Sequence, residues 1–90
     1  MRLRHEDQAK YVAYVLWLIG YSYQTIGKVL HLDRSQVGGI IQRSEYAGRT
    51  SMSRAQRAAL LKELEEIRFE DGRPIDGGIL DRVPFKVMAG

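Results

Sequence analysis

The sequence contains no cysteine among its 90 residues. This absence excludes disulfide bonds, thiolate metal sites and cysteine nucleophiles. There are only two histidines, His5 and His31, and they are too few and too isolated to suggest a metal site. We therefore expect neither a metal nor another cofactor.

Long apolar runs are also lacking. The longest uncharged apolar stretch spans residues 11–19, far below the ~20 residues that a membrane-spanning helix needs. Residues 1–7 mix acidic and basic side chains and precede no small-residue cleavage site, which is not typical of a signal peptide. We expect a cytoplasmic protein with no membrane partner.

Signatures of catalysis are missing as well. The sequence has no glycine-rich phosphate loop and no nucleophile beside a general base. The glutamates of residues 63–66 have the spacing of an ordinary exposed helix face. We therefore expect that the protein is not an enzyme.

Charge is unevenly distributed along a chain whose length corresponds to one domain. Residues 28–57 contain six basic and two acidic side chains, a net charge of +4. Residues 58–90 contain five basic and seven acidic side chains, a net charge of −2. A basic middle beside a mildly acidic end predicts a surface that faces a polyanion next to a surface of another kind.

Hydrophobic periodicity predicts an all-α fold with helices at residues 6–18, 23–30, 34–44 and 54–68. The first helix is apolar almost all round, so the C-terminal segment or a second subunit should cover the side that the other helices leave open. We expect one compact domain, in which residues 1–52 form a helix-turn-helix core with a basic loop. Residues 53–90 then form a C-terminal helix and tail that serve dimerisation.

Local signals set the helix boundaries. Ser22 is suited to cap the second helix, and Asp33 with Gln36 has the spacing of a capping box at the start of the third. Ser53 with Gln56 repeats that spacing before the fourth helix. The tail is expected to be irregular or to form a short hairpin around Asp71-Gly72. Residues 82–88 alternate like an edge strand.

The second and third helices, joined by residues 31–33, have a helix-turn-helix layout. A small residue is needed where the two helices cross, and apolar residues must fill the turn and the inner face of the second helix. Six positions fit this template: Ile26, Gly27, Leu30, Leu32, Val37 and Ile40. His31 departs from the usual glycine, although histidine tolerates a left-handed backbone better than most residues.

The segment 17–49 resembles the helix-turn-helix family of bacterial and phage DNA-binding regulators. It is most similar to sigma-factor region-four-like modules and to the N-terminal module of an alphaproteobacterial cell-cycle regulator family. The resemblance is carried by Trp17, Gly20, Ser22, Ile26, Arg34, Val37, Gly39 and Arg43. It implies that the protein binds double-stranded DNA and that the helix at 34–44 enters the major groove.

The resemblance also implies two groups of contact residues. The candidates for reading base edges are Arg34, Ser35, Gln36, Gly38, Gly39, Gln42 and Arg43. The candidates for binding phosphate are Tyr23, Gln24, Thr25, Lys28, Arg49, Thr50, Ser51, Arg54 and Arg57. Gly38 and Gly39 are costly inside a helix, which is explained either by close packing or by close approach to DNA.

The expected function is that of a transcriptional regulator, a repressor, acting as a homodimer. Dimerisation is predicted through an apolar stripe made of Leu60, Leu61, Leu64 and Ile67. Two alternatives remain open at this point. One is a phage DNA-packaging or replication accessory protein that uses the same module. The other is a protein-interaction module that binds RNA polymerase or another regulator.

Overall fold

The computed structural model describes residues 8–69, 72, 74–78 and 80. These residues form four α-helices, with a single 3₁₀ turn between the third and fourth, and none of them lies in a strand. The predicted all-α fold is therefore confirmed. None of the described helices is long and apolar enough to span a membrane.

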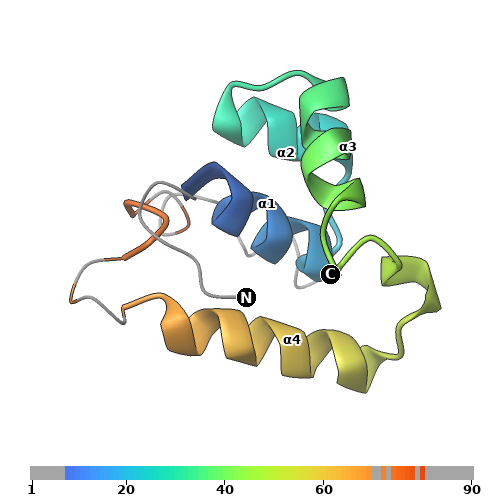
Figure 1. Ribbon diagram of the computed structural model, residues 1–90, viewed down its shortest axis with the longest axis vertical. Coiled ribbons are helices and arrows are strands. Elements are labelled where there is room, and N and C mark those ends of the chain that lie inside the picture. The colour runs from blue at the N-terminus through green and yellow to red at the C-terminus, as the bar shows by residue number, and fades with distance from the viewer. Residues whose placement is uncertain (1–7, 70–71, 73, 79, 81–90) are drawn as a thin grey trace.

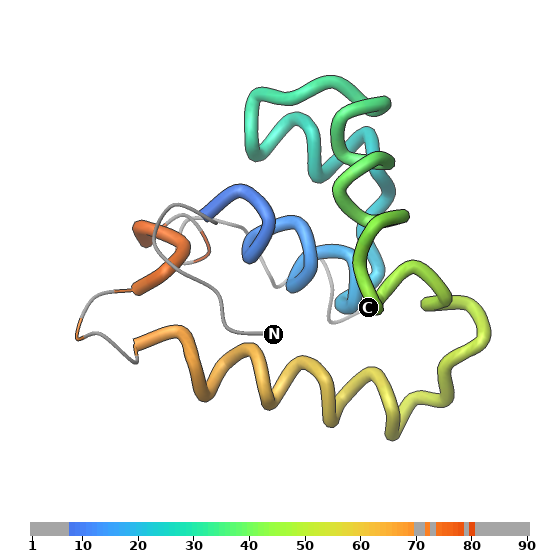
Figure 2. The backbone as a smooth tube through the Cα atoms, in the orientation of Figure 1, coloured from blue at the N-terminus to red at the C-terminus, as the bar shows by residue number. Residues whose placement is uncertain are grey.

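Helix α1 (Gln8–Ile19) lies between the pair formed by α2 (Tyr23–Leu30) and α3 (Arg34–Gln42) on one side and α4 (Arg54–Ile67) on the other (Figure 1). The chain leaves α3 through a loop and the short helix η2 (Arg49–Ser51) before α4 runs back along α1 (Figure 2). The first helix was predicted to begin at Glu6, which is outside the described residues. It ends at Ile19, one residue later than predicted. The next residue, Gly20, has a φ of 133°, a backbone conformation that glycine adopts readily.

The two-sided burial of α1 follows from its composition. Helix α1 contacts both neighbouring layers, and six of its residues are buried: Tyr11, Val12, Ala13, Tyr14, Leu16 and Leu18. Val37 and Ile41 close the core from α3, and Leu64 closes it from α4. The open side of α1 is thus covered by this chain itself, because Ile75 and Leu80 of the C-terminal segment join the same core.

The predicted dimerisation stripe is part of this core. Leu64 is 3% exposed, and its carbonyl accepts a hydrogen bond of 2.6 Å from the Tyr11 hydroxyl of α1. Leu60, Leu61 and Ile67 are partly buried against the same cluster. The buried side of this stripe packs against the apolar face of α1, and pairing of its leucines with a second copy stays a prediction. A helix stripe alone does not say whether its partner is in the same chain.

A buried ion pair ties the C-terminal turn to α4. Asp76 is completely buried, and its carboxylate accepts hydrogen bonds of 2.6 and 3.0 Å from the Arg68 guanidinium and of 2.9 Å from the Leu80 amide. Gln8 donates to the Asp76 carbonyl, which joins the turn to the start of α1. No described residue around Gly72 is in a strand, and residues 70, 71 and 73 of the expected hairpin lie outside the described residues. The strand expected at 82–88 lies outside the described residues.

Candidate nucleic-acid interface

The turn between α2 and α3 is built as the template requires. His31 has φ 59° and ψ 39°, a left-handed conformation, and the Leu32 amide donates to the Gly27 carbonyl at 2.9 Å. A Cβ at Gly27 would lie 2.5 Å from the Leu32 carbonyl oxygen, far inside van der Waals contact. The turn therefore folds back so tightly that only glycine fits at position 27.

Capping boxes start both helices for which they were predicted. At α3 the Asp33 carboxylate accepts from the Gln36 amide at 2.8 Å, and the Gln36 side-chain oxygen accepts from the Asp33 amide at 3.0 Å. Ser53 and Gln56 form the same pair at α4, and Ser22 caps α2. The cap holds the Gln36 carboxamide at the start of α3. The sequence listed Gln36 among the candidates for reading base edges. In the structure its side chain is held by the cap and is not freely adjustable.

The outer face of α3 is small and polar. Val37 and Ile41 are fully buried, which directs the opposite side of this helix outward. Helical spacing places Ser35, Gly39, Gln42 and Arg43 on that side, with Gly39 at its centre. Ser35, Gln42 and Arg43 are exposed, as is Arg34 at the first position of the helix. We call Ser35, Gly39, Gln42 and Arg43 the outer face of α3.

The two adjacent glycines of α3 have different surroundings. Gly38 is buried, and a Cβ there would lie 3.4 Å from the Tyr23 ring. The prediction that Gly38 faces a DNA groove is therefore wrong, because it packs against α2. Gly39 is half-buried, and its Cβ would meet the Arg43 guanidinium at 2.9 Å. Of the two glycines, only Gly39 belongs to the outer face.

Gln24 in the first turn of α2 and Lys28 in its last turn are exposed, and they lie one helical turn apart. Thr25 is partly exposed, and its hydroxyl oxygen accepts from the Ser22 hydroxyl at 3.1 Å. Lys28, Arg34 and Arg43 are exposed cations of the α2–α3 unit, and Asp33 is the single acid between residues 23 and 43. The unit is therefore electropositive, and its acid is held by the cap.

Two arginines that were expected to bind phosphate are instead hydrogen-bonded to the end of α1. Arg49 donates to the carbonyls of Trp17 at 2.9 Å and Tyr21 at 2.8 Å. Arg57 donates to the carbonyls of Leu18, at 2.6 and 2.9 Å, and Ile19, at 2.9 Å. The last carbonyls of a helix have no partner within it, so both guanidinium groups supply what this helix end lacks.

Burial and the nearby positive charge of Arg57 lower the pKa of the Arg49 guanidinium.

The predicted phosphate contacts that follow Arg49 on η2 and at the start of α4 are more exposed to solvent than Arg49 and Arg57. Thr50 and Ser51 are exposed on η2, and Arg54 is exposed at the first position of α4. Helix α4, which begins at Arg54, lies across α1 from the pair α2 and α3 (Figure 1).

Sequence reasoning missed an aromatic stack beside this unit. The Trp17 and Tyr23 rings are stacked, with centroids 4.8 Å apart and planes 25° apart, and the Arg49 guanidinium lies 3.6 Å from the Trp17 ring centroid. The Trp17 indole donates to the Tyr46 carbonyl at 2.7 Å. The sequence placed Tyr23 among the phosphate contacts and gave no indication of the stack. The partners of Trp17 at Tyr46 and Arg49 lie 29 and 32 residues away, which leaves no local signal.

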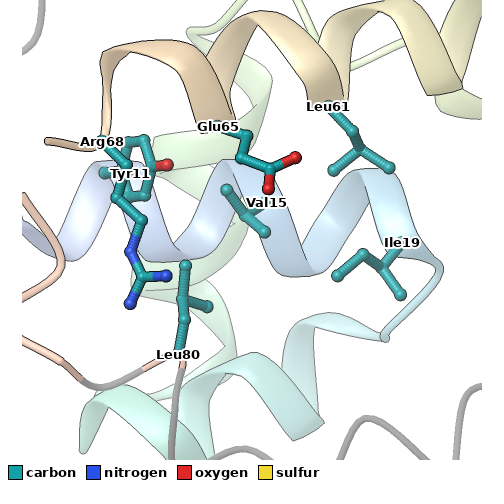
Figure 3. A pocket seen from close by; sticks show the side chains of 7 residues that line it. All are labelled: Tyr11, Val15, Ile19, Leu61, Glu65, Arg68 and Leu80. Atoms are coloured by element: carbon teal, nitrogen blue, oxygen red, sulfur yellow. The ribbon is translucent and has the colours of Figure 1, made fainter. Parts of the chain in front are cut away.

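A cavity lies on the side of α1 that faces α4. It has a volume of about 230 Å³ and opens between α1 and α4 (Figure 3). It is lined by Tyr11, Val15, Ile19, Leu61, Glu65, Arg68 and Leu80. Burial, the largest influence, raises the pKa of Tyr11 to about 12.

Among the described residues, no group of three or more potential ligands is placed to hold a metal ion.

Comparison with protein families, with curated proteins and with solved structures found no match for this chain.

Proposed function

We propose that this protein binds double-stranded DNA by placing the outer face of α3 in the major groove, and that it acts as a transcriptional regulator. The observation that carries the proposal is the composition of that face. Three exposed hydrogen-bonding side chains, Ser35, Gln42 and Arg43, surround a position without a side chain at Gly39.

This arrangement suits base edges for steric and chemical reasons. The major groove admits an α-helix, and arginine and glutamine can each make two hydrogen bonds to one base, guanine and adenine respectively. Gly39 has no side chain of its own, so the helix backbone can approach the bases closely when the Arg43 guanidinium that lies over it turns toward a base. Gln24 and Lys28 of α2 are available to phosphate oxygens, which fix orientation without reading sequence.

The proposed site is smaller than the one inferred from the sequence. It retains Arg34 and the outer face of α3 for bases, and Gln24, Thr25 and Lys28 for phosphates. It omits Gly38, Arg49 and Arg57, because Gly38 packs against Tyr23 and the two arginines bind carbonyls of α1. It does not depend on a dimer through α4, because the apolar stripe of α4 packs on the core of its own chain.

The test begins with selection of bound sequences from random DNA duplexes. We expect enrichment of a short motif, followed by tight binding of that duplex in fluorescence anisotropy. Arg43→Ala should weaken this binding by about 1–3 kcal/mol if the arginine makes two bonds to one guanine. Affinity should also fall steeply as the salt concentration rises.

Lys62→Ala is the matched control, because it also removes one exposed positive charge, but from α4 across α1. Its effect should be small compared with that of Arg43→Ala. No enrichment of any sequence, together with equal effects of the two variants, would overturn the proposal and favour a surface that binds RNA polymerase or another protein.

A further inference from the structure

The aromatic stack connects the two parts of the proposed DNA site. Tyr23 is the first residue of α2, whose N-terminal turn is proposed to meet phosphate, and its ring packs against Gly38 in the middle of α3. Trp17 stacks on the Tyr23 ring, and Gly38 meets the edge of that ring at its Cδ2 and Cε2 atoms. The position of one ring therefore sets the spacing between the phosphate-binding turn and the base-reading helix.

The far end of the stack is held from two directions. The Arg49 guanidinium covers Trp17 at 3.6 Å while donating to the carbonyls of Trp17 and Tyr21. The Trp17 indole donates to the Tyr46 carbonyl at 2.7 Å, so the loop after α3 is fastened to the same ring. Arg49 thus acts on Tyr23 through Trp17, while its Nη1 donates to two protein carbonyls.

We infer that Arg49 and Trp17 are positioning residues for DNA recognition: the stack Arg49–Trp17–Tyr23 fixes α2 relative to α3, so that phosphate binding and base reading occur in one register. This inference rests on the proposed DNA-binding function. Phosphate contacts fix the register of a protein on the duplex, while base contacts select the sequence. Loosening the stack should therefore reduce discrimination between sequences more than it reduces general attraction to DNA.

Arginine is specifically suited to this role. Its guanidinium is planar, stacks on aromatic rings and presents several donors in a fixed geometry, whereas a lysine ammonium is a compact charge on a flexible stem. Arg49→Lys keeps the charge but loses the planar contact with Trp17. Arg49→Met removes the charge and keeps an extended side chain. Comparing the two variants separates a stacking role from a phosphate contact.

The experiment measures the affinity of the full chain for the selected duplex and for a random-sequence duplex over a series of salt concentrations. We expect both Arg49→Lys and Arg49→Met to weaken binding to the selected duplex by about tenfold. Affinity for the random duplex, and the slope of its logarithm against salt, should stay at the wild-type values. Trp17 fluorescence should change in both variants, because the cation has left the indole face.

Lys28→Met is the control for a true phosphate contact. It should weaken binding to both duplexes alike and reduce the slope of the logarithm of affinity against salt by about 0.9. The inference is overturned if Arg49→Met behaves in this way and Arg49→Lys restores wild-type binding, since Arg49 would then touch phosphate. It is also overturned if both Arg49 variants bind the selected duplex as the wild type does.

A second pair of variants leaves the cap of α1 intact in case the Arg49 variants do not fold. Tyr23→Phe keeps the ring and should retain the wild-type affinity for the selected duplex. Tyr23→Leu removes the stack and should weaken binding to the selected duplex by about tenfold, as the Arg49 variants do. Equal selectivity of these two variants would contradict the inference. Failure of the wild type to prefer any duplex would instead refute the proposed function itself, and the inference with it.

Discussion

Three glycines of the α2–α3 unit meet three different constraints. At Gly27 an added Cβ would lie 2.5 Å from the backbone oxygen of Leu32, which cannot move without opening the turn. At Gly38 the neighbour is the Tyr23 ring at 3.4 Å, an ordinary contact distance. At Gly39 the neighbour is the far end of Arg43, a flexible side chain that can move aside. The same residue type is therefore essential at one position and replaceable at another.

Substitution by alanine should separate these roles. Gly27→Ala should lower the free energy of unfolding by about 1–3 kcal/mol, because the backbone of the turn must shift. Gly39→Ala should raise the free energy of unfolding by up to ~1 kcal/mol through helix propensity. Urea denaturation of both variants checks these values. Gly39→Ala should nevertheless weaken binding to the selected duplex, and unchanged binding would show that DNA does not approach at this position.

At the scale of the element, the end of α1 depends on side chains from elsewhere. Arg57 reaches it from the first turns of α4, and its positive charge lies where the helix dipole is negative. Because α4 also covers α1 through Leu64, the arginine and the leucine hold the two helices together in different ways. One satisfies polar groups, and the other removes apolar surface from water.

Arg57→Met should lower the free energy of unfolding by about 1.5–3 kcal/mol, the range for hydrogen bonds to charged groups. Thermal or urea unfolding provides the measurement. Arg54→Met is the matched control, because Arg54 is exposed in the same helix, and surface changes of this kind usually stay within about 0.5 kcal/mol. If both variants unfold alike, the hydrogen bonds from Arg57 to α1 do not contribute to stability.

The elements that the sequence predicted well are those with local causes. The capping box of Asp33 and Gln36 spans three residues, and the turn at His31 depends on its immediate neighbours. The sequence did not indicate the hydrogen bonds of Arg49 and Arg57 to backbone carbonyls, because these acceptors lie 28 to 39 residues away. An arginine without an acidic neighbour in sequence resembles a phosphate ligand until its acceptor carbonyls are known. The sequence does not identify the partner of the α4 leucines for the same reason, since a stripe records burial but not the partner.

At the scale of the whole molecule, Asp76 fastens the C-terminal turn to the helices. Burial alone would raise the pKa of its carboxyl group, but the hydrogen bonds from Arg68 and Leu80 outweigh burial and lower it below the ordinary value of 3.8. The charged form is therefore favoured in the folded state. A lowered pKa stabilises the fold at pH values above 3.8, and this contribution disappears as the pH falls through the folded-state pKa.

Asp76→Asn should therefore lower the free energy of unfolding at neutral pH by about 3 kcal/mol, because Arg68 loses its charged partner. The difference from the wild type should shrink as the pH falls below 3.8, where the wild-type carboxyl group becomes protonated. Urea denaturation over a pH series measures both curves. A difference that is independent of pH would show that Asp76 contributes through packing and not through its charge.

The central place of α1 has a consequence for how the molecule comes apart. Helix α1 contacts each of the other three helices, and six of its residues are buried. Neither layer can detach without exposing that helix to water, so the described fold should melt as one cooperative unit and not in two steps. A ligand held by α3 would then protect α4 against unfolding to the same extent, although α1 separates the two helices.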